Sequence, residues 1–349
     1  MEEGGLPVEE KQFRNKIWWF TFLFSILVVW VHAFNAELFL GKGPQAAGLK
    51  RVQNWIGIGL GQFAVPGFFM ISAYLFYRGF AWEKLGRKWK SRLRSLVIPY
   101  LLWNGIYYLG YVTASRVDGL TDIVGKGKIP LNWETALDAV LHYRYNAVFW
   151  YLCQLIWLIM LTPLIYSFLK RKWTALIWLL AVSACVWVQA DLPVINEDSV
   201  LYYSAAGAAA LHFSEKAEGA GSPAAFLTGA AMTAAGLICY VLFRGGGRVG
   251  LLVFCRLLVP LGVWQMVDKS ILPEVRPWMK DTFFLYAAHF AFVRLVNKTG
   301  AVLIPGNRTA AAALYFFMPG LSLVFSRGVG ELMRRWMPPV WRALTGGRS

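Results

Sequence analysis

The stretch IWWFTFLFSILVVWVHAFNA, residues 17–36, decides the fold class. Its only ionisable side chain is that of His32. Because a membrane-spanning helix needs about 20 mostly apolar residues, this stretch predicts a first transmembrane helix. Residues 1–16 mix acidic and basic side chains, and the apolar run lacks a clear A-x-A cleavage site. We therefore expect the helix to be retained rather than removed as a signal peptide.

The rest of the chain repeats this pattern. Of its 349 residues, 57% are apolar and 15% are charged, whereas soluble domains carry about 25% charged residues. The sequence therefore predicts an all-α, polytopic membrane protein, a single integral-membrane domain over residues 1–349, with an interfacial helix over Trp133–Tyr145. About ten spans are predicted, over residues 17–36, 55–77, 95–114, 147–169, 173–190, 199–213, 224–243, 249–267, 282–297 and 309–326.

The basic residues predict the orientation of these spans. The chain has 35 Lys and Arg against 19 Asp and Glu, a formal charge of +16. With the N-terminus inside, the inner segments hold about twice as many Lys and Arg as the outer loops, as the positive-inside rule requires. We therefore expect a multi-pass protein of the cell (inner or plasma) membrane, with cytoplasmic tails over residues 1–16 and 327–349. The same distribution argues against a nucleic-acid partner, which would need a basic face on a soluble body.

The cysteines predict no metal centre. They lie in apolar stretches, without C-x-x-C spacing or a nearby histidine, and are Cys153, Cys185, Cys239 and Cys255. Buried thiols that act as small hydrophobic side chains account for them. We expect neither a metal nor a bound cofactor.

His32 is the strongest catalytic candidate, because ionisable residues inside predicted spans are functional hypotheses by default. It ends a weakly polar helix face that also carries Thr21 and Ser25. A neutral imidazole there could take a proton from a hydroxyl nucleophile, as a general base does. An interfacial histidine bonded to a carbonyl is the structural alternative. Asn35 and Glu37 could orient or charge the ring if the chain bends after His32.

Four further motifs follow in order along the chain. They are Phe68-Phe-Met-Ile-Ser-Ala-Tyr-Leu75; Arg92 with Pro99-Tyr100 and Trp103; Phe149-Trp-Tyr-Leu152 with Pro163; and Tyr286-Ala-Ala-His289. Together with His32, this series resembles the integral-membrane acyltransferase 3 family, which includes O-acetyltransferases of surface polysaccharides. The resemblance covers most of the chain, and ten spans suit the family.

The resemblance implies acyl transfer from a thioester donor, commonly acyl-CoA, to a hydroxyl of a cell-surface or lipid-linked glycan. His32 would deprotonate the acceptor. The inner basic cluster of Arg87, Lys88, Lys90, Arg92 and Arg94 could hold the phosphates of CoA, although a positive-inside signal that contacts anionic lipids also explains it. The expected substrate-binding residues are Ser72, Tyr74, Arg92, Arg94, Trp150, Arg256, His289 and Arg294.

Three of these residues, Arg256, His289 and Arg294, place a basic side chain inside a predicted span. Arg256 and Arg294 need a partner or an aqueous cavity, and could neutralise donor phosphates or an oxyanion. A structural ion pair is the competing interpretation, although the predicted spans contain no acid. His289 could line the same cavity as Arg294, or simply pack against its neighbours.

The sequence departs from the family pattern at three positions. Thr21 stands where the family carries an arginine eleven residues before the histidine, Ser95 interrupts the R-x-x-R pair, and Ala73 replaces a glycine. Two alternatives to the enzyme therefore stay open: a transporter or flippase for a glycan or small solute, and a non-catalytic subunit of polysaccharide export.

Overall fold

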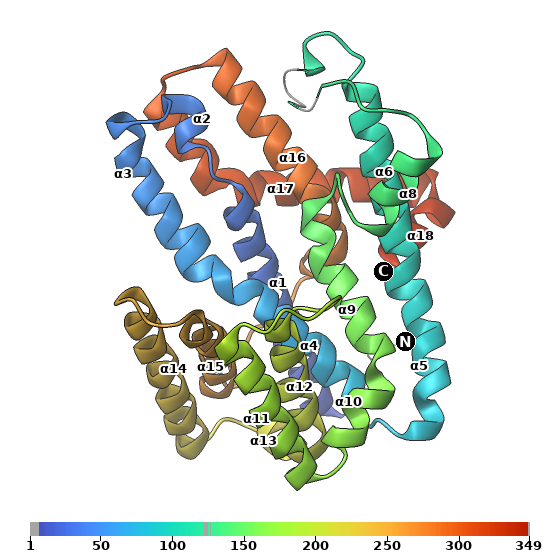
Figure 1. Cartoon of the computed structure of the whole chain (residues 1–349), viewed down its shortest axis with the longest axis vertical. Coiled ribbons are helices and arrows are strands. Elements are labelled where there is room, and N and C mark those ends of the chain that lie inside the picture. The colour runs from blue at the N-terminus through green and yellow to red at the C-terminus, as the bar shows by residue number, and fades with distance from the viewer. Residues whose placement is uncertain (1–6, 122–124, 126, 348–349) are drawn as a thin grey trace. The chain divides into compact units, whose positions relative to one another are not determined.

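The computed structural model describes residues 7–121, 125 and 127–347, which form helices joined by turns, with no strand among them (Figure 1). This result confirms the all-α prediction for that part of the chain. The helices are α1 Val8–His32, α2 Ala36–Leu40, α3 Pro44–Gln53, α4 Ala64–Tyr77, α5 Leu85–Arg92, α6 Ile98–Ala114, α8 Trp133–Leu141, α9 Trp150–Met160, α10 Thr162–Leu169, α11 Lys172–Val188, α12 Glu197–His212, α13 Ser214–Glu218, α14 Pro223–Arg244, α15 Val249–Met266, α16 Thr282–Leu303, α17 Arg308–Trp336 and α18 Pro338–Thr345.

Polar caps set the start of several helices. The side chains of Asn132, Ser222 and Asn307 accept hydrogen bonds from backbone N–H groups in the first turns of α8, α14 and α17. Such caps satisfy donors that a helix N-terminus leaves without intrahelical partners. The short helix expected between residues 133 and 145 is thus α8, which begins at Trp133 directly after its cap.

In the part of the chain that the structure describes, five helical segments are long and apolar enough to cross a membrane. They are Val8–Leu40, Pro44–Tyr77, Pro223–Arg244, Val249–Met266 and Arg308–Trp336; a bent pair, Ala147–Met160 with Thr162–Leu169, would make six. Each coincides with a predicted span. The four other predicted spans are also helical, as α6, α11, α12 and α16, so a count of ten stays a prediction.

The helix is bent within the span that the sequence predicts over residues 147–169. α9 and α10 meet at an angle of 64°. Pro163 lies in the first turn of α10, where it has no N–H to donate to the preceding turn of a continuous helix. This proline explains why α9 does not simply continue into α10.

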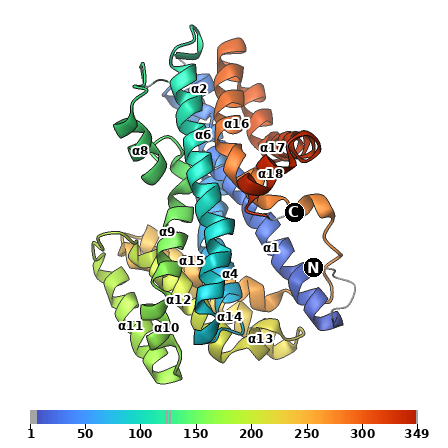
Figure 2. The same ribbon diagram turned by 90° about the vertical axis from the view of Figure 1, so that its right-hand side faces the viewer.

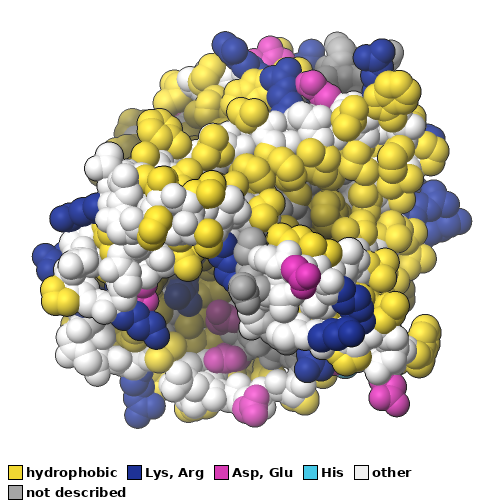
Figure 3. Space-filling view, turned by 90° about the horizontal axis from the view of Figure 1, so that it is seen from above, with side chains coloured by type: hydrophobic (Ala, Val, Ile, Leu, Met, Phe, Trp, Pro, Cys, Tyr) yellow, Lys and Arg dark blue, Asp and Glu magenta, His cyan; other side chains and the backbone are white. Residues whose placement is uncertain are grey.

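The exposed surface is strongly apolar. Large hydrophobic side chains cover much of the face seen in Figure 3. Val241, Phe317 and Val324 are 68%, 70% and 73% exposed. A soluble monomer rarely exposes large contiguous apolar patches, whereas lipid solvates such side chains. The chain is therefore a membrane protein.

The chain forms two compact units. Unit 1 comprises Met1–Phe24, Gln62–Trp89 and Gln154–Lys280. Within it, α12 packs against α4, α10 and α11, and α14 pairs with α15 along its length. α12 is buried over most of its residues, and a Cβ on its Gly207 would lie 2.8 Å from the Tyr77 ring. The small residues of this segment thus permit the close helix packing that they predict.

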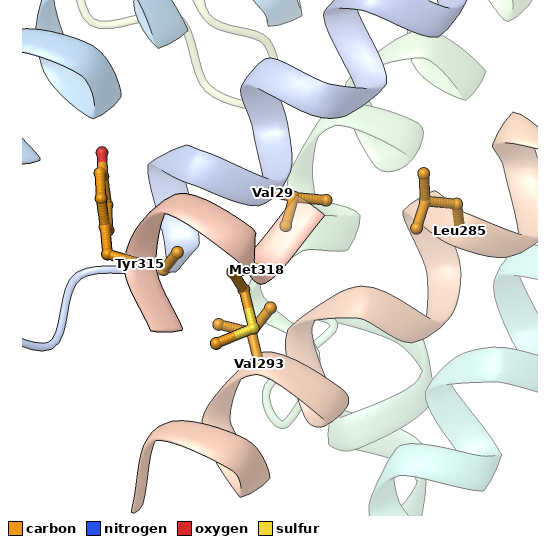
Figure 4. Packing of buried hydrophobic residues seen from close by; sticks show 6 residues of the cluster. Val29, Leu285, Val293, Tyr315 and Met318 are labelled. Atoms are coloured by element: carbon orange, nitrogen blue, oxygen red, sulfur yellow. The ribbon is translucent and has the colours of Figure 1, made fainter. Parts of the chain in front are cut away.

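Unit 2 comprises Ser25–Gly61, Lys90–Cys153 and Asp281–Ser349. α16 and α17 pack together and against α2, while α6 packs against α8 and α18 (Figure 2). A buried cluster joins the end of α1 to α16 and α17 (Figure 4). Its members are Val29, Ala33, Leu285, Val293, Tyr315 and Met318. This core fixes the end of α1, where His32 lies, against α16.

Candidate active site

His32 and His289 lie side by side in unit 2. α1 ends at His32. The centre of the His32 ring lies 5.3 Å from the centre of the His289 ring on α16. The ring of Phe290 lies at the same distance, edge to face with His32. Two residues predicted to take part in the site are therefore brought together although 257 positions separate them along the chain.

Backbone contacts set the protonation of His289. Its Nδ1 lies 2.7 Å from the carbonyl oxygen of Tyr286 and 3.2 Å from that of Leu285. Because a carbonyl only accepts, Nδ1 carries the proton and Nε2 keeps a lone pair. The side chain of His289 is 1% exposed, and its Nε2 has no hydrogen-bond partner among the described residues. The pair therefore contains a buried acceptor beside the His32 ring.

Two tyrosines position the turn of α16 that carries His289. The hydroxyl of Tyr286 donates to the carbonyl of Val148 over 2.7 Å. The Tyr107 hydroxyl, from α6, donates to the carbonyl of Ala287 over 2.9 Å and accepts the N–H of Ala291 over 3.2 Å. These contacts fix α16 on both sides of His289, at Ala287 and at Ala291. Tyr107 has no signal of its own in the sequence, because its role depends on a partner on another helix.

A buried amide cluster, formed by Asn35, Gln53 and Asn297, fixes the chain immediately after His32. Asn35 Nδ2 donates to Asn297 Oδ1 over 3.1 Å, and Gln53 Nε2 donates to Asn35 Oδ1 over 2.7 Å. Asn297 Nδ2 in turn donates to the carbonyl of Ala33 over 3.1 Å, next to the end of α1. All three side chains are buried. Because the cluster satisfies polar groups at the break between α1 and α2, it holds His32 at a defined helix end.

The two residues expected to act on the His32 ring have other partners. Asn35 belongs to the amide cluster, and Glu37 forms an ion pair of 2.5 Å with Lys50. Residues 33–35 interrupt the helix, and α2 begins at Ala36. Asn35 and Glu37 contact neighbouring segments, and His289 is the polar side chain whose ring contacts His32.

The predicted phosphate-binding arginines, Arg92 and Arg94, occupy a helical junction in unit 2. Arg92 ends α5, and Arg94 lies in a π-helical segment, Leu93–Val97, that leads into α6. Arg94 is exposed and Arg92 is half-buried. π-helical turns occur frequently at functional sites. This position leaves the Arg94 guanidinium accessible to an anionic ligand.

Three predicted substrate-binding residues, Ser72, Tyr74 and Arg256, belong to unit 1. The Tyr74 hydroxyl donates to Glu218 Oε1 over 2.6 Å. Arg256 Nε donates to Gln62 Oε1 over 3.3 Å, and the guanidinium interacts electrostatically with Asp198. Asp198 directly precedes the predicted span 199–213. Arg256 therefore has an acidic neighbour, although the predicted spans themselves contain no acid.

Two more predicted residues lie in unit 2. The guanidinium carbon of Arg294 lies 5.5 Å from the ring centre of Phe290, whose other neighbour is His32. Trp150 is half-buried at the start of α9. Within residues 7–121, 125 and 127–347, no group of three His, Cys, Asp or Glu side chains could hold a metal ion.

A half-buried ion-pair network in unit 1 has no signal in the sequence. Arg78 follows α4 and pairs with Glu10 over 2.7 Å and with Glu218 over 2.5 Å. Hydrogen bonds that the Arg78 guanidinium donates to these two carboxylates raise its pKa above the usual value. The network ties the beginning of α1 to α4 and α13. The sequence placed these charges in cytoplasmic segments, without indicating that they meet.

Comparisons with known proteins point to a family of acyltransferases. A family model for an acyltransferase domain, that of acyltransferase family 3, matches residues 18–327. The succinoglycan biosynthesis protein ExoH of Rhizobium meliloti (strain 1021) is 23% identical over 346 residues, which cover 92% of this chain and 89% of that protein. No solved structure gives a significant match. The family match begins within α1 and extends into α17, so it includes both histidines.

Proposed function

The chain belongs to the acyltransferase 3 family, and on that premise we propose that it moves an acyl group, such as acetyl, from acyl-CoA to a hydroxyl of a cell-surface or lipid-linked glycan. As a member of this family it is a membrane acyltransferase. The relative ExoH is named for the biosynthesis of succinoglycan, which supports a glycan acceptor. We propose ten spans in the cell membrane, with both termini cytoplasmic.

The single observation that carries the mechanism is the His32–His289 pair. His32 removes the proton of the acceptor hydroxyl as its oxygen attacks the thioester carbonyl. A C–O ester bond forms, the C–S bond breaks, and the leaving thiolate takes up the proton from the His32 imidazolium. The buried Nε2 of His289 supports this role by offering an acceptor to the N–H of the His32 ring, which favours one orientation of that ring.

Further residues of each unit are proposed to contact the substrates. Arg92 and Arg94 would bind the phosphates of CoA through charge-assisted hydrogen bonds. Arg294, beside Phe290, would stabilise negative charge on the carbonyl oxygen during attack. Ser72, Tyr74 and Trp150 are proposed to contact substrate on the strength of the family resemblance, and Arg256 because it is a charge inside a predicted span. Tyr74 also contacts Glu218, and Arg256 also interacts with Asp198, so both residues have a structural role as well.

The test is acyl transfer by purified protein from radiolabelled acetyl-CoA to an isolated surface glycan. Loss of a general base lowers a rate by about 10²–10⁴-fold, so we expect such a loss for His32→Ala. The matched control is His142→Ala, because His142 is an exposed histidine on the protein surface, paired with Asp138. Arg92→Ala should raise the KM for acetyl-CoA more than it lowers kcat.

The outcomes separate the hypotheses. Transfer by His32→Ala at the wild-type rate would refute the general-base role. Movement of glycan across a proteoliposome membrane without acyl transfer would favour a transporter. Absence of both activities from correctly folded wild-type protein, supplied with donor and acceptor, would favour a non-catalytic subunit.

A further inference from the structure

A polar cavity of about 530 Å³ lies in unit 1, beside the first turns of α1. Its wall combines residues 11–18 of α1 with residues 269–280, which connect α15 to α16. Small-ligand sites typically have volumes of about 300–1,000 Å³, so the cavity is large enough for one. It contains none of the residues assigned above to acyl transfer.

The connection that forms one wall is held in place. Asn15 Nδ2 donates to the carbonyls of Leu272 and Pro273 over 3.2 and 2.9 Å, and its Oδ1 accepts the N–H of Val275 over 2.8 Å. Trp19 Nε1 donates to the same Pro273 carbonyl over 2.7 Å. At its start, the N–H of Ser270 donates to Asp268 and lowers the pKa of that carboxyl. The cavity is therefore preformed, which lowers the entropic cost of binding.

The lining is cationic. Among the described residues it contains Lys11, Arg14, Lys269 and Lys280, against the single carboxylate of Glu274. Lys269 is 5% exposed and donates to the carbonyl of Glu218 over 2.6 Å. Because an ammonium has three donors and a guanidinium has five, one protein contact leaves donors for a ligand. Arg14 is likewise held, by Glu10 over 2.6 Å.

These cations come from two segments, residues 1–16 and 268–281, which the positive-inside rule assigns to the cytoplasm. That rule explains why they are basic, but it does not require them to converge on one cavity. Four cations around a concave, fixed wall match an anion with several acceptor oxygens. Trp18 adds an aromatic ring to the same lining.

We propose that this cavity is a phosphate-binding site, which takes a phosphate or diphosphate group from the cytoplasmic side. The group can belong to a soluble nucleotide or to the headgroup of an anionic phospholipid. The chemistry recognised is the same in both cases, and the proposal does not depend on the acyl donor or on His32.

Two charge-reversal variants test the site. Lys11→Glu/Lys280→Glu changes the cavity, while Lys170→Glu/Lys216→Glu makes the same charge change at exposed positions of unit 1 outside the lining. The soluble arm measures pyrophosphate and ADP binding by calorimetry in phosphatidylcholine nanodiscs, because the phosphates of CoA are assigned to Arg92 and Arg94. We expect the dissociation constant to rise by at least about tenfold in the cavity variant, since charged hydrogen bonds are lost, and to stay unchanged in the control.

The lipid arm uses native mass spectrometry of protein purified from phosphatidylglycerol-containing membranes. If the ligand is a headgroup, wild type and control retain phosphatidylglycerol, and the cavity variant loses it. Weaker binding by the cavity variant than by the control, in either arm, supports the site. The arm in which it occurs identifies the source of the phosphate. Equal binding of all three probes by the cavity variant and the control, or no binding by wild type, would overturn the proposal.

Folding and activity are monitored separately. Melting temperature checks the fold, and Lys11→Gln/Lys280→Gln replaces the reversal variant if that variant unfolds. Lys11→Arg/Lys280→Arg should retain affinity, because it keeps both charges. Acetyl transfer by the same variants distinguishes the two proposals, because loss of phosphate binding with transfer intact concerns the cavity alone.

Discussion

The position of His289 depends on one functional group, the hydroxyl of Tyr107. It contacts the carbonyl of Ala287 and the N–H of Ala291, on either side of the histidine. Tyr107→Phe removes both contacts and keeps the ring. Because small displacements of catalytic groups can cost about 10²-fold in rate, we expect a loss of up to about that size in kcat for acyl transfer, with little change in KM.

The control for this prediction is the neighbouring tyrosine of α6. The Tyr108 hydroxyl donates to the carbonyl of Pro130 over 2.9 Å, so Tyr108→Phe removes one hydroxyl from the same helix without touching α16. Steady-state kinetics and melting temperature are measured for both variants. Equal kcat losses in the two variants would show that Tyr107 acts only through general stability.

At the scale of elements, α14 and α15 approach so closely that their glycines cannot carry side chains. A Cβ on Gly262 would lie 2.5 Å from the carbonyl oxygen of Gly229 and 2.4 Å from Thr233 Oγ1. Because the opposing atoms include backbone, Gly262→Ala must separate the helices, and overpacking of this kind costs about 1–3 kcal/mol. We expect a lower melting temperature in detergent.

The matched substitution is Gly105→Ala on α6, where a Cβ would meet no atom within 4 Å. Alanine favours a helix over glycine by about 0.5–1 kcal/mol, so this variant should melt at a higher temperature than wild type. An unchanged or higher melting temperature for Gly262→Ala would show that the α14–α15 contact tolerates separation.

The sequence predicted the positions of helices better than the contacts between them. The length and apolarity of a helical segment are properties of consecutive residues in the sequence. These two properties predict the helices α1, α14, α15 and α17. Asn35 shows where this reasoning ends: its proximity to His32 in the chain suggested contact with the ring, but its partner is Asn297, 262 positions away. Arg78, Glu10 and Glu218 likewise meet only after folding.

The site was predicted in part for the same reason. His32 and His289 were identified because ionisable residues inside apolar segments are costly, and this signal is local. Tyr107 and Gln53 carry no such signal, since a buried tyrosine or amide is explained equally well by ordinary packing. The polar cavity of unit 1 has no such signal either, because the positive-inside rule accounts equally well for its cations.

At the scale of the whole molecule, the number of spans determines on which side the C-terminus lies. Five spans would put the two termini on opposite sides of the membrane, whereas six or ten would put them on the same side. The basic residues favour an inner C-terminus, because residues 327–349 contain Arg327, Arg334, Arg335, Arg342 and Arg348. We therefore expect green fluorescent protein fused after Ser349 to fluoresce, and alkaline phosphatase fused there to be inactive. The control fusions follow residue 118, in the loop predicted to lie outside, and should give the reverse pattern. An active phosphatase at the C-terminus would require an odd number of spans and would place residues 327–349 on the outer side, against their charge.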